Sequence, residues 1–424
     1  MINNLISKLS LIFSDPDLRR KILFAAGMLI LFRLGNAIPI PSVDTLRLQQ
    51  FLAGNQFFGL LNIFSGGGLS NLSIFMLGVG PYITASIIMQ LLTMIFPSLK
   101  TLYQEEGEAG RKKFAQYSRM LSVPLAFLQG FGLLALLKRQ GVLGTIVFAT
   151  EIQNVLVVTA GAVLVMWIGE LITEYGISNG TSLLIFAGIV AQMPSSAGQI
   201  LANFTPADIP LYLAFLVVAL VIIAGVVTIT EAERPVPITY AKRVRGMKVY
   251  GGVSTYLPLR VNQAGVIPII FALSILLFPQ LVASFLSGID NAVVQKIADI
   301  LNALTRNTWI YSIAYFGLVF AFTYFYTAVT FDPDAISTNL QKSGAFIPGI
   351  RPGKSTSVYL SYVLTRLTLV GALFLGLIAV LPLLMRTVTG NASLAIGGTA
   401  LLIVVSVVVE LIRQLDAQVS MREY

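Results

Sequence analysis

The chain of 424 residues contains no cysteine and no histidine, and only 11% of its residues are charged. The lack of cysteine excludes disulfides and thiolate metal ligands, and the lack of histidine excludes imidazole ligands and histidine proton relays. Most hydrolytic, redox and metal-dependent chemistries therefore lose their usual side chains. We expect neither an enzyme nor a site for a metal or another cofactor.

Apolar residues replace the missing charge: 56% of the chain is hydrophobic and the mean hydropathy is +0.83. Soluble domains carry about 25% charged residues. The composition therefore predicts a polytopic membrane protein. The first 20 residues form a charged, amphipathic stretch without a small-residue cleavage site, so we expect the first span to be retained.

Ten apolar runs of spanning length predict an all-α protein with ten transmembrane helices. Of the 28 Lys and Arg residues, 20 fall on the side that holds the N-terminus and 6 on the other. This bias predicts that both termini are cytoplasmic. Two sets of five spans, in residues 1–202 and 203–424, would be inverted in the membrane, because an odd number starts the second half on the opposite side. The runs are 21–38, 71–97, 119–138, 151–173, 181–201, 211–231, 263–286, 309–329, 362–384 and 395–414.

One stretch breaks the pattern of whole spans. The apolar segment Phe57–Phe64 is too short to cross a bilayer, a break follows at Ser65–Gly68, and a long apolar helix is expected from about Asn71. The short segment must be sheltered by protein or water, because backbone polar groups that face lipid would stay unpaired. A pore stopper and a re-entrant binding loop both fit this pattern.

The predicted spans contain few ionisable residues that could serve transport of a charged substrate. All of them except Glu170 lie near a span end, where anchoring at the interface or pairing between helices explains them. A ring of aliphatic side chains can gate a pore, but periodicity does not identify its members. The ionisable candidates are Arg33, Glu170, Glu174, Glu231, Arg366 and Glu410.

Polar sequence gathers in three inner loops, so the working partners are expected in the cytoplasm. The first loop, Lys100–Arg119, mixes acids and bases. The second (232–262) combines β-favouring residues with several bases and predicts a projecting basic hairpin. The third (330–361) contains an Asp-Pro-Asp helix-capping signal and an Ile-Arg-Pro-Gly turn at 350–353. The net charge of +9 also favours anionic lipid, an RNA-containing partner or an acidic partner.

The chain resembles the SecY/Sec61-alpha family, the channel subunits of protein translocons, over essentially its whole length. The resemblance rests on ordered motifs at the expected topological positions. They are NIFSGG (62–67), GPYITASII (80–88), EGEAGR (106–111), IFAGIV (185–190), YAKR (240–243), LRVN (259–262), AGVIP (264–268) and GAFIPGIRPG (344–353).

The resemblance implies two five-helix halves around an hourglass pore, with a lateral gate between spans two and three and spans seven and eight. The implied plug covers residues 57–70, including Phe57, Phe58, Leu60, Leu61, Ile63, Phe64, Gly66 and Gly67. The implied pore ring is Val79, Ile83, Ile185, Ile189, Ile270 and Ile403, and the polar gate residues are Gln90 and Asn262. Ribosome and SecA docking would use Lys242, Arg243, Arg245, Lys248 and Arg351.

The same resemblance implies a protein-conducting channel of the bacterial plasma membrane, for polypeptides that bear signal sequences and cross it or enter it sideways. The implied partners are the SecE and SecG subunits, the SecA motor ATPase, the ribosome and unfolded preproteins. The alternative is a secondary transporter that uses Phe57–Gly68 as a re-entrant substrate loop. An intramembrane enzyme lacks the His, Cys or central Asp pair that it would need.

Overall fold

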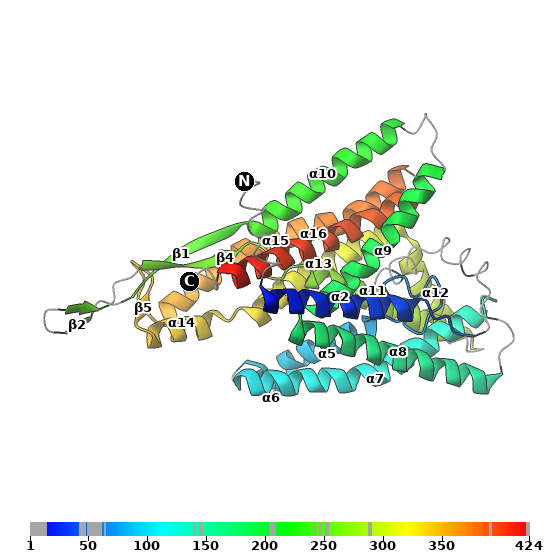
Figure 1. Cartoon of the computed structure of the whole chain (residues 1–424), viewed down its shortest axis with the longest axis horizontal. Coiled ribbons are helices and arrows are strands. Elements are labelled where there is room, and N and C mark those ends of the chain that lie inside the picture. The colour runs from blue at the N-terminus through cyan, green and yellow to red at the C-terminus, as the bar shows by residue number, and fades with distance from the viewer. Residues whose placement is uncertain are drawn as a thin grey trace.

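The protein is a long bundle of helices from which one β hairpin projects (Figure 1). The computed structural model describes residues 15–41, 48, 62, 65–104, 106–139, 141–143, 147–202, 209–240, 243–245, 248–250, 254–286, 291–389 and 392–420. The helices are α2 (Pro16–Asn36), α5 (Gly80–Ile95), α6 (Pro97–Gln104), α7 (Gly107–Arg139), α8 (Phe148–Tyr175), α9 (Gly180–Ala202), α10 (Ile209–Glu231), α11 (Ile267–Leu286), α12 (Ala292–Arg306), α13 (Thr308–Thr330), α14 (Pro333–Lys342), α15 (Lys354–Thr389) and α16 (Ala392–Ser420).

Each of the ten apolar runs overlaps a helix, and the described residues include several helices that could cross a membrane. By length and composition, five stretches qualify alone: Gly107–Lys138, Phe148–Tyr175, Leu213–Glu231, Thr308–Lys342 and Lys354–Leu381. A sixth is the pair Gly80–Ile95 and Pro97–Tyr103, which is bent by 116°. The fold class is confirmed as an all-α bundle of membrane-spanning type, and the count of ten spans stays a prediction.

The prediction of a helix from about Asn71 was wrong. Residues 65–79 form tight turns, and α5 begins only at Gly80, with Pro81 in its first turn. Gly78 has a φ of 55° and Leu72 a φ of 42°, in the left-handed region that a right-handed helix excludes. Proline is favoured in the first turn of a helix, because the N–H it lacks would have no helical partner there. Residues 71–79 are mostly apolar, so the sequence pattern placed the start of α5 too early.

The first and third inner loops are also more helical than expected. Most of Lys100–Arg119 belongs to α6 and α7, so Arg119 lies within a helix. The predicted loop 330–361 ends earlier, because α15 already begins at Lys354. The capping signal is confirmed: the Asp332 side chain accepts hydrogen bonds from the backbone N–H groups of Asp334 and Ala335, at 2.9 and 3.2 Å.

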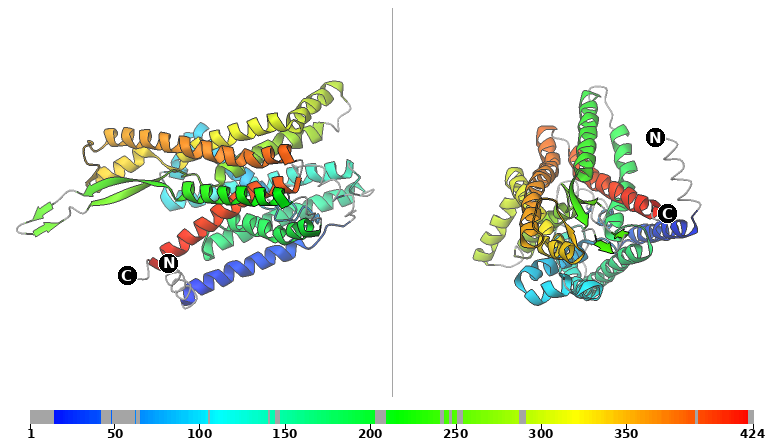
Figure 2. Two further views of the ribbon diagram at one scale, coloured as in Figure 1. Left: turned by 90° about the horizontal axis from the view of Figure 1, so that it is seen from above. Right: turned by 90° about the vertical axis from the view of Figure 1, so that its left-hand side faces the viewer.

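The projecting basic hairpin in the second loop is confirmed. Strands β1 (Glu233–Tyr240) and β4 (Ser254–Arg260) pair antiparallel, with Val236 opposite Leu257. Strand β5 (Ala345–Phe346) adds to the free edge of β1 and so connects the third loop to the second. Farther out, β2 (Arg243–Arg245) pairs with β3 (Lys248–Tyr250), and Figure 2 shows this tip well beyond the helices.

A small apolar cluster fixes the base of the hairpin on the bundle. Val236 and Leu259 are buried there against Ile347, Leu360 and Val363, which come from the third loop and from α15. The start of α2 and the end of α16 lie toward this same end of the molecule (Figure 1). Both ends of the described chain therefore share one side with the basic loops.

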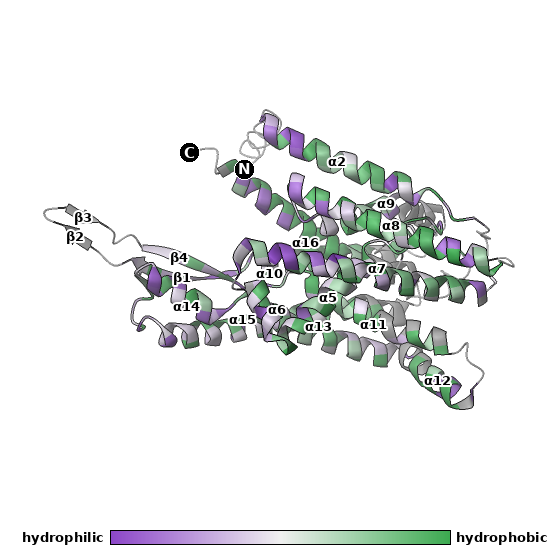
Figure 3. Cartoon of the chain, turned by 90° about the horizontal axis from the view of Figure 1, so that it is seen from below, coloured by the Kyte–Doolittle hydropathy of each residue, from purple (hydrophilic) through white to green (hydrophobic). Residues whose placement is uncertain are grey.

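The predicted halves meet along two seams. Helix α11 packs against α5 and α7, and α16 packs against α9. The largest apolar cluster crosses these seams and includes buried residues from α2, α8, α9, α11, α13, α15 and α16. A second cluster lies wholly within the first half, around Leu72, Leu133 and Val158. The apolar helical bodies and their polar ends can be followed by hydropathy in Figure 3.

Candidate functional site

The six aliphatic positions proposed from the resemblance come from four separate elements and meet in one apolar cluster. Val79 is the residue before α5 and Ile83 lies in its first turn, whereas Ile185 and Ile189 are one turn apart on α9. Ile270 lies in the first turn of α11, and Ile403 lies along α16. Five of the six are at most 7% exposed, and Ile83 packs against them half-buried.

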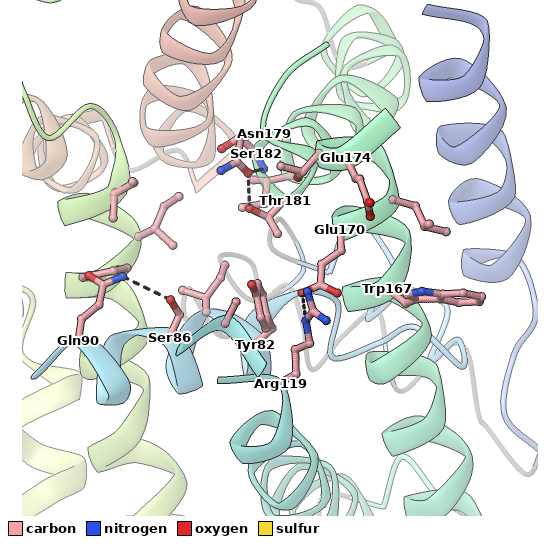
Figure 4. A pocket seen from close by; sticks show the side chains of 18 of the residues that line it. Tyr82, Ser86, Gln90, Arg119, Trp167, Glu170, Glu174, Asn179, Thr181 and Ser182 are labelled. Atoms are coloured by element: carbon pink, nitrogen blue, oxygen red, sulfur yellow. Dashed lines mark hydrogen bonds and ion pairs between the residues drawn. The ribbon is translucent and has the colours of Figure 1, made fainter. Parts of the chain in front are cut away.

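A cavity of about 540 Å³ opens beside this cluster. Ile83, Ile185 and Ile270 contribute to its lining, so part of the apolar cluster forms one wall. The other walls are more polar and include Tyr82, Ser86, Gln90, Glu174 and Ser182, drawn in Figure 4. The arrangement is a cavity with several polar walls that borders a buried apolar cluster.

An ion pair fixes one wall of the cavity. The Arg119 guanidinium on α7 donates a hydrogen bond to the Glu170 carboxylate on α8, and both side chains line the cavity (Figure 4). Glu170, the ionisable candidate that lies away from a span end, therefore pairs between two helices. Sequence reasoning missed Arg119 as its partner, because that residue was counted in a loop. The pair joins two helices of the first half and adds no bond across the seam.

The glycine end of the predicted plug is held between α2 and α9. The Gly66 carbonyl accepts hydrogen bonds from Asn36 Nδ2 at 3.2 Å and from Arg33 Nη1 at 3.4 Å. Gly66 has a φ of 66°, which glycine adopts without strain, and a β carbon there would meet the Phe32 ring at 2.5 Å. The predicted plug residues Phe57, Phe58, Leu60, Leu61, Ile63 and Phe64 lie outside the described residues.

Residues 72–74, between the glycine end of the predicted plug and Val79, are held by hydrogen bonds to residues 36–40. Ile40 N–H donates to the Leu72 carbonyl at 2.9 Å, and Ile74 N–H donates to the Ile38 carbonyl at 3.0 Å. The buried Ser73 hydroxyl also donates to Asn36 Oδ1 at 3.4 Å. These bonds attach the turns that lead to Val79 to the end of α2.

Of the two polar residues predicted near a gate, Gln90 lies on α5 and Asn262 lies just before α11, and these two helices meet at one seam. Gln90 on α5 donates from Nε2 to Ser86 Oγ at 3.4 Å, and Asn262, just before α11, donates from Nδ2 to the Gly265 carbonyl at 3.2 Å. Among the described residues, the buried side-chain oxygens of both make no hydrogen bond. Gln90 lines the cavity and Asn262 does not. Both amides are therefore incompletely satisfied within the described residues.

The basic residues predicted to dock partners lie at the hairpin end. Arg243, Arg245 and Lys248 belong to the outer strands β2 and β3, and Arg245 lies opposite Lys248. Lys242 lies outside the described residues. Arg351 is exposed in the turn before α15, and its carbonyl accepts a hydrogen bond from Thr356 Oγ at 2.9 Å. Because β5 pairs with β1, this turn is tied to the hairpin.

Comparison with known proteins identifies relatives along the whole chain. The family model described as SecY matches residues 73–412. The protein translocase subunit SecY of Mycobacterium tuberculosis (strain ATCC 25618 / H37Rv) is 45% identical over 435 residues, which cover 96% of this chain and 96% of the relative. The subunit of the same name from Streptomyces galbus is 45% identical, with 97% of each chain covered.

Solved structures share the fold at lower identity. A structure described as that of a protein conducting channel covers 94% of this chain and 91% of its own, with a TM-score of 0.65 and 19% identity. Sec61 in a canine ribosome-channel complex covers the same shares, with a TM-score of 0.61 and 18% identity. The matched family model, the close relatives and the shared fold together show that this chain belongs to the SecY family.

Proposed function

We propose that this chain is a protein-conducting channel that passes unfolded polypeptides across a membrane and releases apolar segments sideways into it. One observation supports the proposal: residues 79, 83, 185, 189, 270 and 403, from four elements, gather in one apolar cluster beside a polar-walled cavity, where they would form an aliphatic constriction. The solved relatives that share the fold include protein-conducting channels.

An aliphatic constriction suits a substrate of arbitrary sequence. A channel for any polypeptide gains nothing from specific polar contacts, whereas close-packed aliphatic side chains can exclude ions when closed and deform around a chain when open. Ile185 and Ile189 on α9 face the cluster together, one helical turn apart, which gives the constriction depth as well as width.

Residues 65–79 would connect the plug to this constriction. The Gly66 end is bonded to α2, and the chain then runs through the pinned turns to Val79. Moving the plug away requires breaking the bonds of Gly66 with Asn36 and Arg33, so plug release and widening at Val79 would be mechanically coupled. Solved relatives include one in which the plug domain stabilises the closed channel and maintains a membrane seal.

The lateral gate would be the seam where α11 meets α5 and α7. Gln90 and Asn262 each keep a buried oxygen without a described hydrogen bond, which costs about 1–3 kcal/mol per group. An apolar signal helix that entered the seam would separate these helices and let water reach both amides. The unsatisfied amides would therefore lower the cost of opening.

The basic hairpin and the Arg351 turn would dock cytoplasmic partners, the SecA motor ATPase and the ribosome. Contact of bases with ribosomal RNA is electrostatic and weakens as salt rises. In a bacterial plasma membrane, with both termini cytoplasmic, the remaining partners would be SecE, SecG and anionic lipid. Energy would come from these partners, because the channel itself would be passive.

Reconstitution tests this function against the alternative of a secondary transporter. Proteoliposomes that contain this chain with SecE and SecG receive SecA, ATP and a preprotein with a signal sequence. Protease-protected preprotein is the expected result, and its formation should stop without ATP. Accumulation of a small solute against its gradient, with no protected preprotein, would support the transporter and overturn the channel.

A further inference from the structure

Helix α12 has a surface that neither the cavity nor the basic loops explain. It lies between α11 and α13 and packs against both, at the end of the molecule opposite the β2–β3 tip (Figures 1 and 3). Val293, Ile297 and Ile300 are 68%, 46% and 59% exposed. Their spacing of four and three residues places them on one face of the helix.

The circumference of α12 divides into three sectors. Ala298 is 1% exposed and faces the protein, with Val294 and Leu301 half-buried beside it. Gln295, Lys296 and Asp299 are exposed on the opposite side. Val293, Ile297 and Ile300 occupy the sector between these two, so the apolar surface of the helix extends beyond the part that the protein covers.

The position of α12 along the chain indicates what covers this remaining apolar sector. Only Asn307 separates α12 from α13, and its side chain caps α13 by accepting a hydrogen bond from Trp309 N–H at 3.0 Å. The exposed apolar surface of α13 begins at once, with Trp309 64% and Ile313 70% exposed. Exposed tryptophan at the end of a spanning helix is typical of the level where headgroups meet acyl chains. The C-terminal end of α12 therefore lies at that level.

We propose that α12 is an interfacial helix whose Val293, Ile297 and Ile300 sector inserts into the acyl-chain boundary of the membrane leaflet at this end of the molecule. The sector that carries Gln295 and Asp299 then faces water. Amphipathic helices bind at this depth through their apolar area. Lys296 and Asp299 leave the described polar sector without net charge, so insertion should not depend on anionic lipid.

The inferred role gives α12 a share in gating. It adjoins α11, which carries Ile270 of the constriction and packs at the seam. With its apolar sector inserted in the interface, α12 would keep the adjoining end of α11 at a fixed depth in the membrane while the seam opens. This step rests on the proposed channel function, whereas the insertion itself rests only on the membrane-spanning fold.

Site-directed spin labelling tests the insertion, and the absence of natural cysteine means that no background residue needs replacement. Single variants Val293→Cys, Ile297→Cys, Ile300→Cys, Gln295→Cys and Asp299→Cys are labelled in nanodiscs of neutral phosphatidylcholine. Collision with oxygen reports acyl chains, and collision with a soluble nickel chelate reports water. Leu220→Cys on α10, where the side chain is 58% exposed, is the reference for a lipid-facing position.

Labels at 293, 297 and 300 should favour oxygen over nickel, as at 220, and labels at 295 and 299 should show the reverse ratio. Equal nickel access at all five positions would overturn the proposal and leave α12 in water. Protection of 293, 297 and 300 from both reagents would also overturn it, because a protein would then cover the sector. Neither result would count against the proposed channel function, because this experiment does not measure translocation.

Discussion

The α carbon of Gly66 lies 2.2 Å from the position that a β carbon on Gly188 would occupy. Gly66 belongs to the glycine end of the predicted plug, and Gly188 on α9 precedes Ile189, which belongs to the proposed aliphatic constriction. No side chain fits between the two, so the glycine end of the predicted plug packs directly on the helix that carries Ile185 and Ile189 of the proposed constriction. A single methyl group added at position 188 would therefore clash with the backbone of Gly66.

Gly188→Ala should therefore weaken the closed state. The added methyl group must displace Gly66 or α9, at a cost of about 1–3 kcal/mol for overpacking. The expected results are raised ion conductance of the idle protein in bilayers and export of a reporter with a defective signal sequence. Gly198→Ala on the same helix is the matched control, because its β carbon would meet nothing within 4 Å. Equal ion conductance and equal reporter export in the two variants would show that the contact of Gly66 with Gly188 does not stabilise the closed state.

Asn36 should be a structural anchor of the plug segment. It is 1% exposed and bonds both the Gly66 carbonyl and the Ser73 hydroxyl. Asn36→Leu leaves these buried groups short of a partner, so we expect a loss of about 1–3 kcal/mol in unfolding free energy. Thermal unfolding in detergent measures it. The exposed neighbour Asn71, which makes one bond of 3.5 Å to the Asn36 carbonyl, is the control, and Asn71→Leu should change little.

Polar substitution in the aliphatic cluster should loosen it. Ile189→Asn buries an amide at a position 4% exposed, which costs the closed state about 1–3 kcal/mol and favours entry of water. Export of reporters with defective signal sequences should rise. Val190→Asn, at a position 38% exposed on the same helix, is the control. If Ile189→Asn and the equivalent variant Ile270→Asn both reject defective signal sequences as strictly as the parent protein, these residues do not line the path.

Arg351→Glu should impair transport that depends on a cytoplasmic partner while leaving the fold intact. The side chain is exposed, and the turn is held by its backbone carbonyl through Thr356, so stability should change by less than about 0.5 kcal/mol. SecA-driven translocation and ribosome binding at increasing salt measure the effect. Lys296→Glu on α12 is the control, because it makes the same change of charge at the opposite end of the molecule. It should leave both SecA-driven translocation and ribosome binding unchanged. Normal transport by Arg351→Glu would exclude a docking role for this turn.

The sequence predicted the helices wherever apolar runs are long and bounded by charge, and it predicted the hairpin from β-favouring residues. It misplaced the start of α5, because Leu72 and its apolar neighbours read as helix although they form turns. The pair Gly80-Pro81 was the available signal, since proline commonly occupies the first helical turn. Helices α6 and α12 are too short to cross a membrane, so the search for apolar runs of spanning length did not predict them.

Local pattern could not reveal the contacts that define the site. Gly66 and Gly188 are far apart in the chain, and only packing brings them together. The pairing of Arg119 with Glu170 depends on how α7 and α8 align, which periodicity does not fix. The six aliphatic positions came from the family resemblance, because an isoleucine in a constriction and one that faces lipid look alike in the sequence.

Crosslinking of a trapped substrate tests the central claim most directly. A preprotein with a folded domain at its end is arrested in proteoliposomes, and single variants Ile185→Cys, Ile270→Cys and Ile403→Cys are probed with a cysteine in the arrested segment. Disulfides should form at all three positions and not at Leu220→Cys, whose side chain is exposed on the outer surface of α10. Adducts at 220 without adducts at 185, 270 and 403 would contradict a path through the aliphatic cluster.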